Sequence, residues 1–70
     1  MIIKQKNYNN YIIRLLKFKN LIALDYFNYD MLTGLFLKTF NNSEEEKAKE
    51  FFNNLDEQKI SKLLEACCNG

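Results

Sequence analysis

The sequence predicts an all-α fold, a small four-helix domain that ends in an αα-hairpin. Two observations favour helices: apolar residues recur at the helical period, most clearly in the second half, and residues suited to helix N-caps precede several apolar runs. Hydrophobic residues make up 47% of the 70-residue chain, so a packed core is expected rather than disorder. We predict one domain: a short basic arm at 1–7, then helices at roughly 8–19 or beyond, 28–40, 44–54 and 57–68.

The first predicted helix has the least regular pattern. One helical face would carry six apolar residues, namely Tyr8, Tyr11, Ile12, Leu15, Phe18 and Ile22. Ile13, Leu21 and Leu24 fall nearly opposite that face, and a break near Asn20 would account for them. The alternative is a pair of strands, with residues 2–3 and 11–13 paired around a turn. β-branched residues favour the strands, whereas the poor alternation of apolar and polar residues disfavours them.

The helix expected at 28–40 begins with Asn28 as its N-cap. Its apolar side consists of Met31, Leu32, Leu35, Phe36 and Phe40. Gly34 lies inside this helix at a cost of roughly 1 kcal/mol relative to alanine. Close approach of another backbone would explain the glycine, but we favour sequence drift.

The helix expected at 44–54 has the clearest start signal. Ser43 and Glu46 have the spacing of a capping box, and acidic residues in the first turn complement the helix dipole. The predicted core face follows the i, i+3, i+4, i+7 spacing and consists of Ala48, Phe51, Phe52 and Leu55.

The last helix is expected to follow a very short turn, which predicts the αα-hairpin. Asp56 is its predicted N-cap, with Leu55 and Ile60 packed across the cap, and Asn69 and Gly70 suit a C-cap. Its predicted apolar face consists of Ile60, Leu63, Leu64 and Cys67. We expect Cys67 to be a small buried hydrophobe, because a helix C-terminus disfavours a reactive thiolate.

The chain contains few residues suited to catalysis. Histidine is absent, and the only cysteines, Cys67 and Cys68, are adjacent and cannot cross-link distant segments. No glycine-rich phosphate loop, nucleophile elbow or carboxylate-rich metal loop is present. We therefore predict no enzymatic activity, no catalytic or metal-ligating residues and no cofactor.

Charge is segregated along the chain. The first 19 residues hold five positive charges and no acid, whereas the remainder holds nine acids and five lysines. Composition rich in residues with AT-rich codons fits, among other sources, a phage or mobile element. We predict a non-enzymatic protein-binding regulator, an adaptor or stoichiometric inhibitor, with self-association as a second use of its surplus apolar residues. The candidate partner-binding residues are Tyr8, Tyr11, Arg14, Lys17, Lys19, Leu24 and Leu37.

The alternative function is weak nucleic-acid binding without sequence preference. The basic segment would contact phosphates, and Tyr8 and Tyr11 would stack on bases. A helix-turn-helix is disfavoured, because its recognition helix would open with the acidic run 44–46. A plainer interpretation is a solvated basic edge lying across the acidic C-terminal half of its own or a neighbouring subunit.

No membrane association is predicted. Lys4, Lys6 and Arg14 interrupt any N-terminal signal segment, and no uncharged run approaches the roughly 18 residues that span a bilayer. We expect a cytoplasmic protein with reduced thiols.

Overall fold

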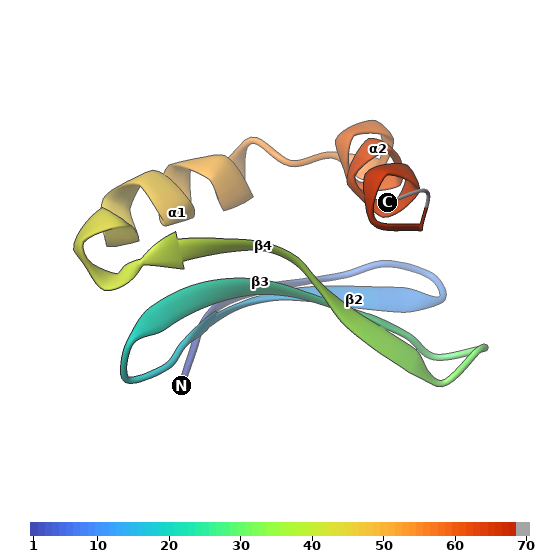
Figure 1. Ribbon diagram of the computed structural model, residues 1–70. Helices are drawn as coiled ribbons and strands as arrows, with labels where there is room; N and C mark the ends of the chain where they lie inside the picture. Colours follow the sequence, from blue (N-terminus) through green and yellow to red (C-terminus); the bar gives the residue numbers. More distant parts are fainter. Residues whose placement is uncertain (69–70) are drawn as a thin grey trace.

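The computed structural model describes residues 1–68 and shows an α+β fold, in which two helices cover one face of a four-stranded antiparallel sheet (Figure 1). The strands lie side by side in chain order and are β1 (Ile2–Asn7), β2 (Tyr11–Lys17), β3 (Leu21–Asn28) and β4 (Thr33–Asn41). A 3-10 turn, η1 (Asn42–Glu44), leads into α1 (Glu45–Asn53), and α2 (Glu57–Cys68) follows. The predicted all-α helical bundle is therefore wrong for the first half of the chain.

The N-terminal half forms a sheet around two strands that are largely apolar on both sides, β2 and β3. The helix predicted at 8–19 is instead β2, and the expected arm at 1–7 contributes β1. These segments form a β-hairpin, as in the alternative prediction, but its strands are longer and Ile2 lies opposite Leu16 rather than opposite residues 11–13. β2 and β3 are the two central strands, and both carry apolar residues on the side that faces the helices and on the opposite side, so their sequences lack clear two-residue alternation. When the sequence of such a strand is plotted as a helix, apolar residues fall on two opposed faces. This explains why Ile13 and Leu24 lie opposite the apolar face of the predicted helix.

The helix predicted at 28–40 is a turn followed by β4. Asn28 does act as a cap, but of this turn: its Oδ1 accepts a hydrogen bond from the Met31 N–H at 2.9 Å. The residue types that cap helices also stabilise turns, which explains the misassignment. Gly34 is explained by close approach rather than drift, because a Cβ there would lie 3.1 Å from the Tyr26 carbonyl oxygen.

The two C-terminal helices are confirmed, with changed details. Glu44 Oε1 accepts a hydrogen bond from the Asn41 N–H at 3.2 Å, so the cap begins two residues before the predicted Ser43. Asp56 caps α2 as predicted, since its Oδ1 accepts from the Lys59 N–H at 2.8 Å. The C-cap expected at 69–70 lies outside the described residues.

The helices do not form the predicted αα-hairpin. In Figure 1, α1 is seen from the side and α2 nearly end-on, so their axes are steeply inclined to one another. Both helices pack on the sheet instead, because the sheet offers an apolar face that each helix can cover.

The core lies between the sheet and the helices. Its buried side chains are Ile13, Leu15, Ile22, Leu24, Tyr26, Leu37, Ala48, Phe52, Leu55 and Ile60. The predicted helical core faces are therefore confirmed for Ala48, Phe52, Leu55 and Ile60. Cys67 is exposed, against expectation, because α2 continues beyond the Leu63 and Leu64 side chains that pack on the core. No helix within residues 1–68 combines the length and apolar character needed to span a membrane.

Candidate protein-binding surface

Among residues 1–68, no segment covers the sheet face opposite the helices (Figure 1). Paired residues of neighbouring antiparallel strands project from the same face, so the register defines three rows of side chains across it. From one end to the other, the rows are Ile2, Leu16, Ala23, Thr39; then Gln5, Arg14, Asp25, Phe36; then Asn7, Ile12, Phe27, Gly34. We call this surface the open face.

Large apolar side chains are exposed on and beside the open face. Phe36 is 54% exposed and Ile2 50%, and Phe18 in the β2–β3 turn is 44% exposed. The Phe18 and Phe36 rings meet edge to face, with their centroids 6.2 Å apart. Such a group of apolar side chains on a small domain indicates an interaction surface.

Phe36 stands between two hollows. One, of about 380 Å³, is lined by Phe18, Lys19, Asn20, Leu21 and Phe36 itself. The other, of about 340 Å³, is lined by Asp25, Gly34, Leu35 and Phe36. The open face therefore presents one projecting aromatic ring with a recess on either side of it.

The charges at the centre of the open face neutralise each other. Arg14 Nε donates to Asp25 Oδ2 at 2.8 Å, and Nη2 donates to the same oxygen. Asp25 is only 7% exposed. Because Arg14 and Asp25 are the only charged residues in the three rows, the rows carry no net charge.

The predicted partner-binding residues are not gathered on one surface. Leu24 and Leu37 are buried in the core between sheet and helices, so neither is available to a partner. Tyr8 and Tyr11 stack on each other with centroids 4.7 Å apart, and both pack against the core on the helical side. Burial raises the pKa of the Tyr11 phenol, and the Glu57 charge adds to the effect.

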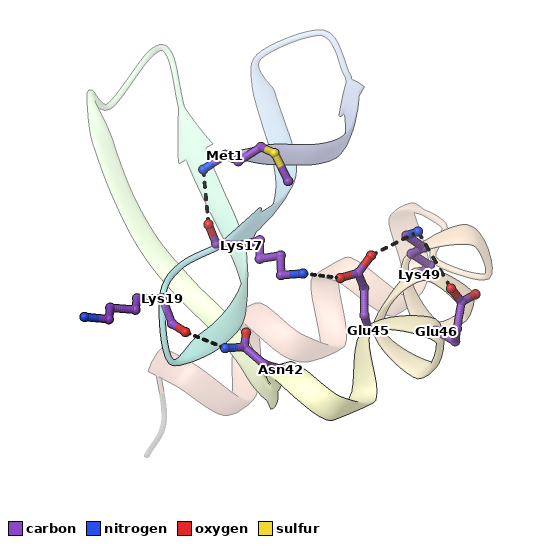
Figure 2. Close-up of polar contacts among 7 residues, drawn as sticks. All are labelled: Met1, Lys17, Lys19, Asn42, Glu45, Glu46 and Lys49. Atoms are coloured by element: carbon purple, nitrogen blue, oxygen red, sulfur yellow. Dashed lines mark hydrogen bonds and ion pairs between the residues drawn. The ribbon is translucent and has the colours of Figure 1, made fainter.

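Lys17 binds within its own chain. Its Nζ donates to Glu45 Oε1 at 2.7 Å, and Lys49 Nζ lies 3.2 Å from Glu45 Oε2 (Figure 2). The hydrogen bond from Lys17, followed by that from Lys49, lowers the pKa of the Glu45 carboxyl. This contact agrees with the interpretation of the basic segment as an edge lying across the acidic half of its own subunit.

The Lys17–Glu45 pair predicts a pH dependence of stability. A carboxyl whose pKa is lowered on folding stabilises the protein above its ordinary value of 4.5, and this contribution is lost as pH falls through the folded-state pKa. Lys17→Met should therefore unfold at lower urea than wild type at pH 7, and the difference should shrink on acidification below 4.5. A difference that persists in acid would show that Lys17 acts through packing of its alkyl chain.

Lys6 and Lys19 lie in different parts of the structure and make different contacts. Lys6 Nζ donates to the carbonyl oxygens of Phe52 at 3.1 Å and Leu55 at 3.2 Å, so it caps the C-terminal end of α1. The carbonyl of Lys19 accepts from Asn42 Nδ2, while its side chain extends away from that contact (Figure 2). Three of the five N-terminal cations, Lys6, Arg14 and Lys17, are thus engaged within the chain.

Sequence reasoning missed Ile12, Leu16, Phe27 and Phe36 as surface candidates. A signal for them exists in the sequence, because β2 and β3 are apolar at successive positions, which gives each strand apolar residues on both of its sides. Within residues 1–68, no cluster of histidine, cysteine or acidic side chains could hold a metal ion. No protein-family model matches the chain, and no curated protein or solved structure is significantly similar to it.

Proposed function

We propose that the protein is a non-enzymatic protein-binding module, an adaptor or stoichiometric inhibitor, and that it binds through the open face. The observation that carries this proposal is the uncovered apolar sheet face with its exposed Phe36 ring. A standard protein interface buries about 800 Å² per partner, about one-sixth of the 4786 Å² accessible surface of this chain. One sheet face can supply a surface of that order.

The chemistry of the open face defines its partner. Because Arg14 and Asp25 satisfy each other, a charged partner gains little there, whereas an apolar and uncharged surface loses no solvated charge on binding. A second copy of the chain has this character. Its Phe36 ring also matches the hollows beside Phe36, and a twofold axis repeats that contact in both directions. The occupant we propose for the isolated protein is therefore a second copy.

Sedimentation equilibrium tests this assignment. Wild type should approach twice the monomer mass of 8.4 kDa at micromolar concentration. Phe36→Asp should remain monomeric, because it places a carboxylate in an apolar contact. Salt should not weaken association, since Arg14 and Asp25 neutralise each other and Lys19, which lines one hollow, is cationic in both copies.

Met31→Asp is the matched control. Met31 is 71% exposed and lies in the β3–β4 turn, outside the three rows of the open face, so this variant should dimerise like wild type. Equal dimerisation of Phe36→Asp and wild type would refute the open face as the contact. If wild type stays monomeric, the second copy is not the partner. If a host protein captured by wild type and by Met31→Asp is then lost with Phe36→Asp, the open face still binds a protein partner.

Nucleic-acid binding is not favoured by these contacts. Lys6, Arg14 and Lys17 are engaged within the chain, and Tyr8 and Tyr11 pack against the core rather than presenting free faces to bases. We retain the cytoplasm as the proposed compartment, on the basis of the sequence.

A further inference from the structure

A second candidate surface lies in the helical layer, on the opposite side of the sheet from the open face. It is a groove of about 290 Å³ lined by Phe51, Asn54, Leu55, Lys59, Lys62 and Leu63. Phe51, Leu55 and Leu63 provide its apolar walls, and the two lysines provide positive charge at its rim. The groove therefore combines the two properties needed to bind an amphiphilic anion.

Within the described residues 1–68, the cations around the groove form no ion pair. Lys59 Nζ donates to the Asn54 carbonyl oxygen at 3.1 Å, which holds this ammonium group at the groove. Lys62 is three residues further along α2, so it projects from the same side of the helix. Lys38 Nζ, from β4, lies 5.5 Å from the centroid of the Phe51 ring.

Among residues 1–68, the only basic residues that form ion pairs are Arg14, Lys17, Lys47 and Lys49. The acidic residues near Lys59 and Lys62 along α2 form no ion pair with either lysine. Asp56 accepts the Lys59 backbone N–H as N-cap, and Glu65 forms no ion pair with Lys62. The ammonium groups of Lys59 and Lys62 thus remain available to an anion.

We propose that this groove binds a free medium-chain carboxylate of about eight to ten carbons. The alkyl chain would lie against Phe51, Leu55 and Leu63, and the carboxylate would accept hydrogen bonds from Lys59 and Lys62. At about 290 Å³, the groove lies at the small end of the range of roughly 300 to 1,000 Å³ typical of small-molecule sites, which suits a short amphiphile. A helical peptide would need a longer groove for its i, i+3, i+4 and i+7 anchors, so a small amphiphile fits better.

The proposal is independent of the function assigned to the open face, because the two surfaces share no residue. Binding is expected to be weak, roughly high micromolar to millimolar, since the ligand has few atoms and the groove is open to solvent. Each added methylene should tighten binding by up to about fourfold until the groove is filled.

Titrations of the isotope-labelled chain followed by amide chemical shifts test the proposal, with hexanoate, octanoate and decanoate as probes below their micelle concentrations. Shifts should concentrate in residues 51–63, and affinity should rise from hexanoate to decanoate. Octanol is the matched neutral ligand and should bind about two- to fivefold more weakly than octanoate, because it lacks the charge that two partly exposed lysines stabilise.

Substitution of the two lysines separates charge from shape. Lys59→Met with Lys62→Met should lose most of the preference for octanoate over octanol, because only Lys38 then remains near the groove. Lys47→Met should keep the wild-type preference, since Lys47 Nζ lies 3.7 Å from Glu44 Oε2 and outside the groove. Any of three results would overturn the proposal: no shifts in residues 51–63, equal binding of octanol and octanoate by wild type, or shifts centred on the open face.

Discussion

Phe52→Ala should lower the free energy of unfolding by about 3 to 5 kcal/mol, the largest stability loss that we expect from a single substitution. The ring is 1% exposed and lies in the core between α1 and the sheet. A domain of this size has a total stability of only roughly 4 to 10 kcal/mol, so the variant should be marginal or unfolded at 25 °C. Urea denaturation followed by far-UV circular dichroism measures the loss.

Phe51→Ala is the matched control for that experiment. Phe51 is the adjacent residue on the same helix, but it is half-buried, where it contacts the Phe40 ring and lines the groove. Its truncation should cost clearly less than that of Phe52, because it leaves no enclosed cavity. Equal losses at 51 and 52 would contradict the orientation of α1 on the sheet.

The C-terminal half could be predicted from sequence because its signals are local. The Asp56 cap, and the spacing that places Ala48, Phe52 and Ile60 in the core, act within a few residues and need no knowledge of the rest of the fold. The relative orientation of the helices could not be predicted in this way. It depends on the sheet on which they pack.

The N-terminal half was misassigned for a physical reason. A central strand that is apolar on both sides, such as β2, carries no two-residue alternation, and its residues then fit a helical period almost as well. Asn28 reinforced the error, because an asparagine that caps a turn and one that caps a helix cannot be told apart by type.

The candidate surface could be predicted only in part, because a surface is defined by register. Arg14 was singled out for its charge, but its pairing with Asp25 follows from the alignment of β2 with β3. Leu24 and Leu37 were chosen as surplus apolar residues, and the sheet buries both under the helices. Phe36 faces the other way and is exposed. The face on which Phe36 lies is fixed by a bulge in β4: Phe36 pairs with Asp25, and Lys38, two residues on, pairs with Leu24. No local sequence pattern reveals this bulge.

The second large effect is expected at the centre of the open face. Arg14→Leu should destabilise the protein by roughly 2 kcal/mol, between the cost of breaking an exposed ion pair and that of breaking a buried one. The Asp25 side chain is 10% exposed and would lose its counter-ion, whereas the Arg14 side chain is 34% exposed and keeps part of its hydration. Urea denaturation at pH 7 gives this loss directly.

The double variant Arg14→Leu with Asp25→Leu distinguishes the cost of leaving the Asp25 carboxylate unpaired from any contribution of the ion pair to the shape of the sheet. Replacing both partners by apolar residues removes the unpaired carboxylate, so stability should return close to that of wild type. The same variant removes both charges from the three rows of the open face, so the self-association that we propose should be tighter in this variant than in wild type. A double variant as unstable as Arg14→Leu, or one that dimerises less than wild type, would mean that the pair is required for the shape of the sheet.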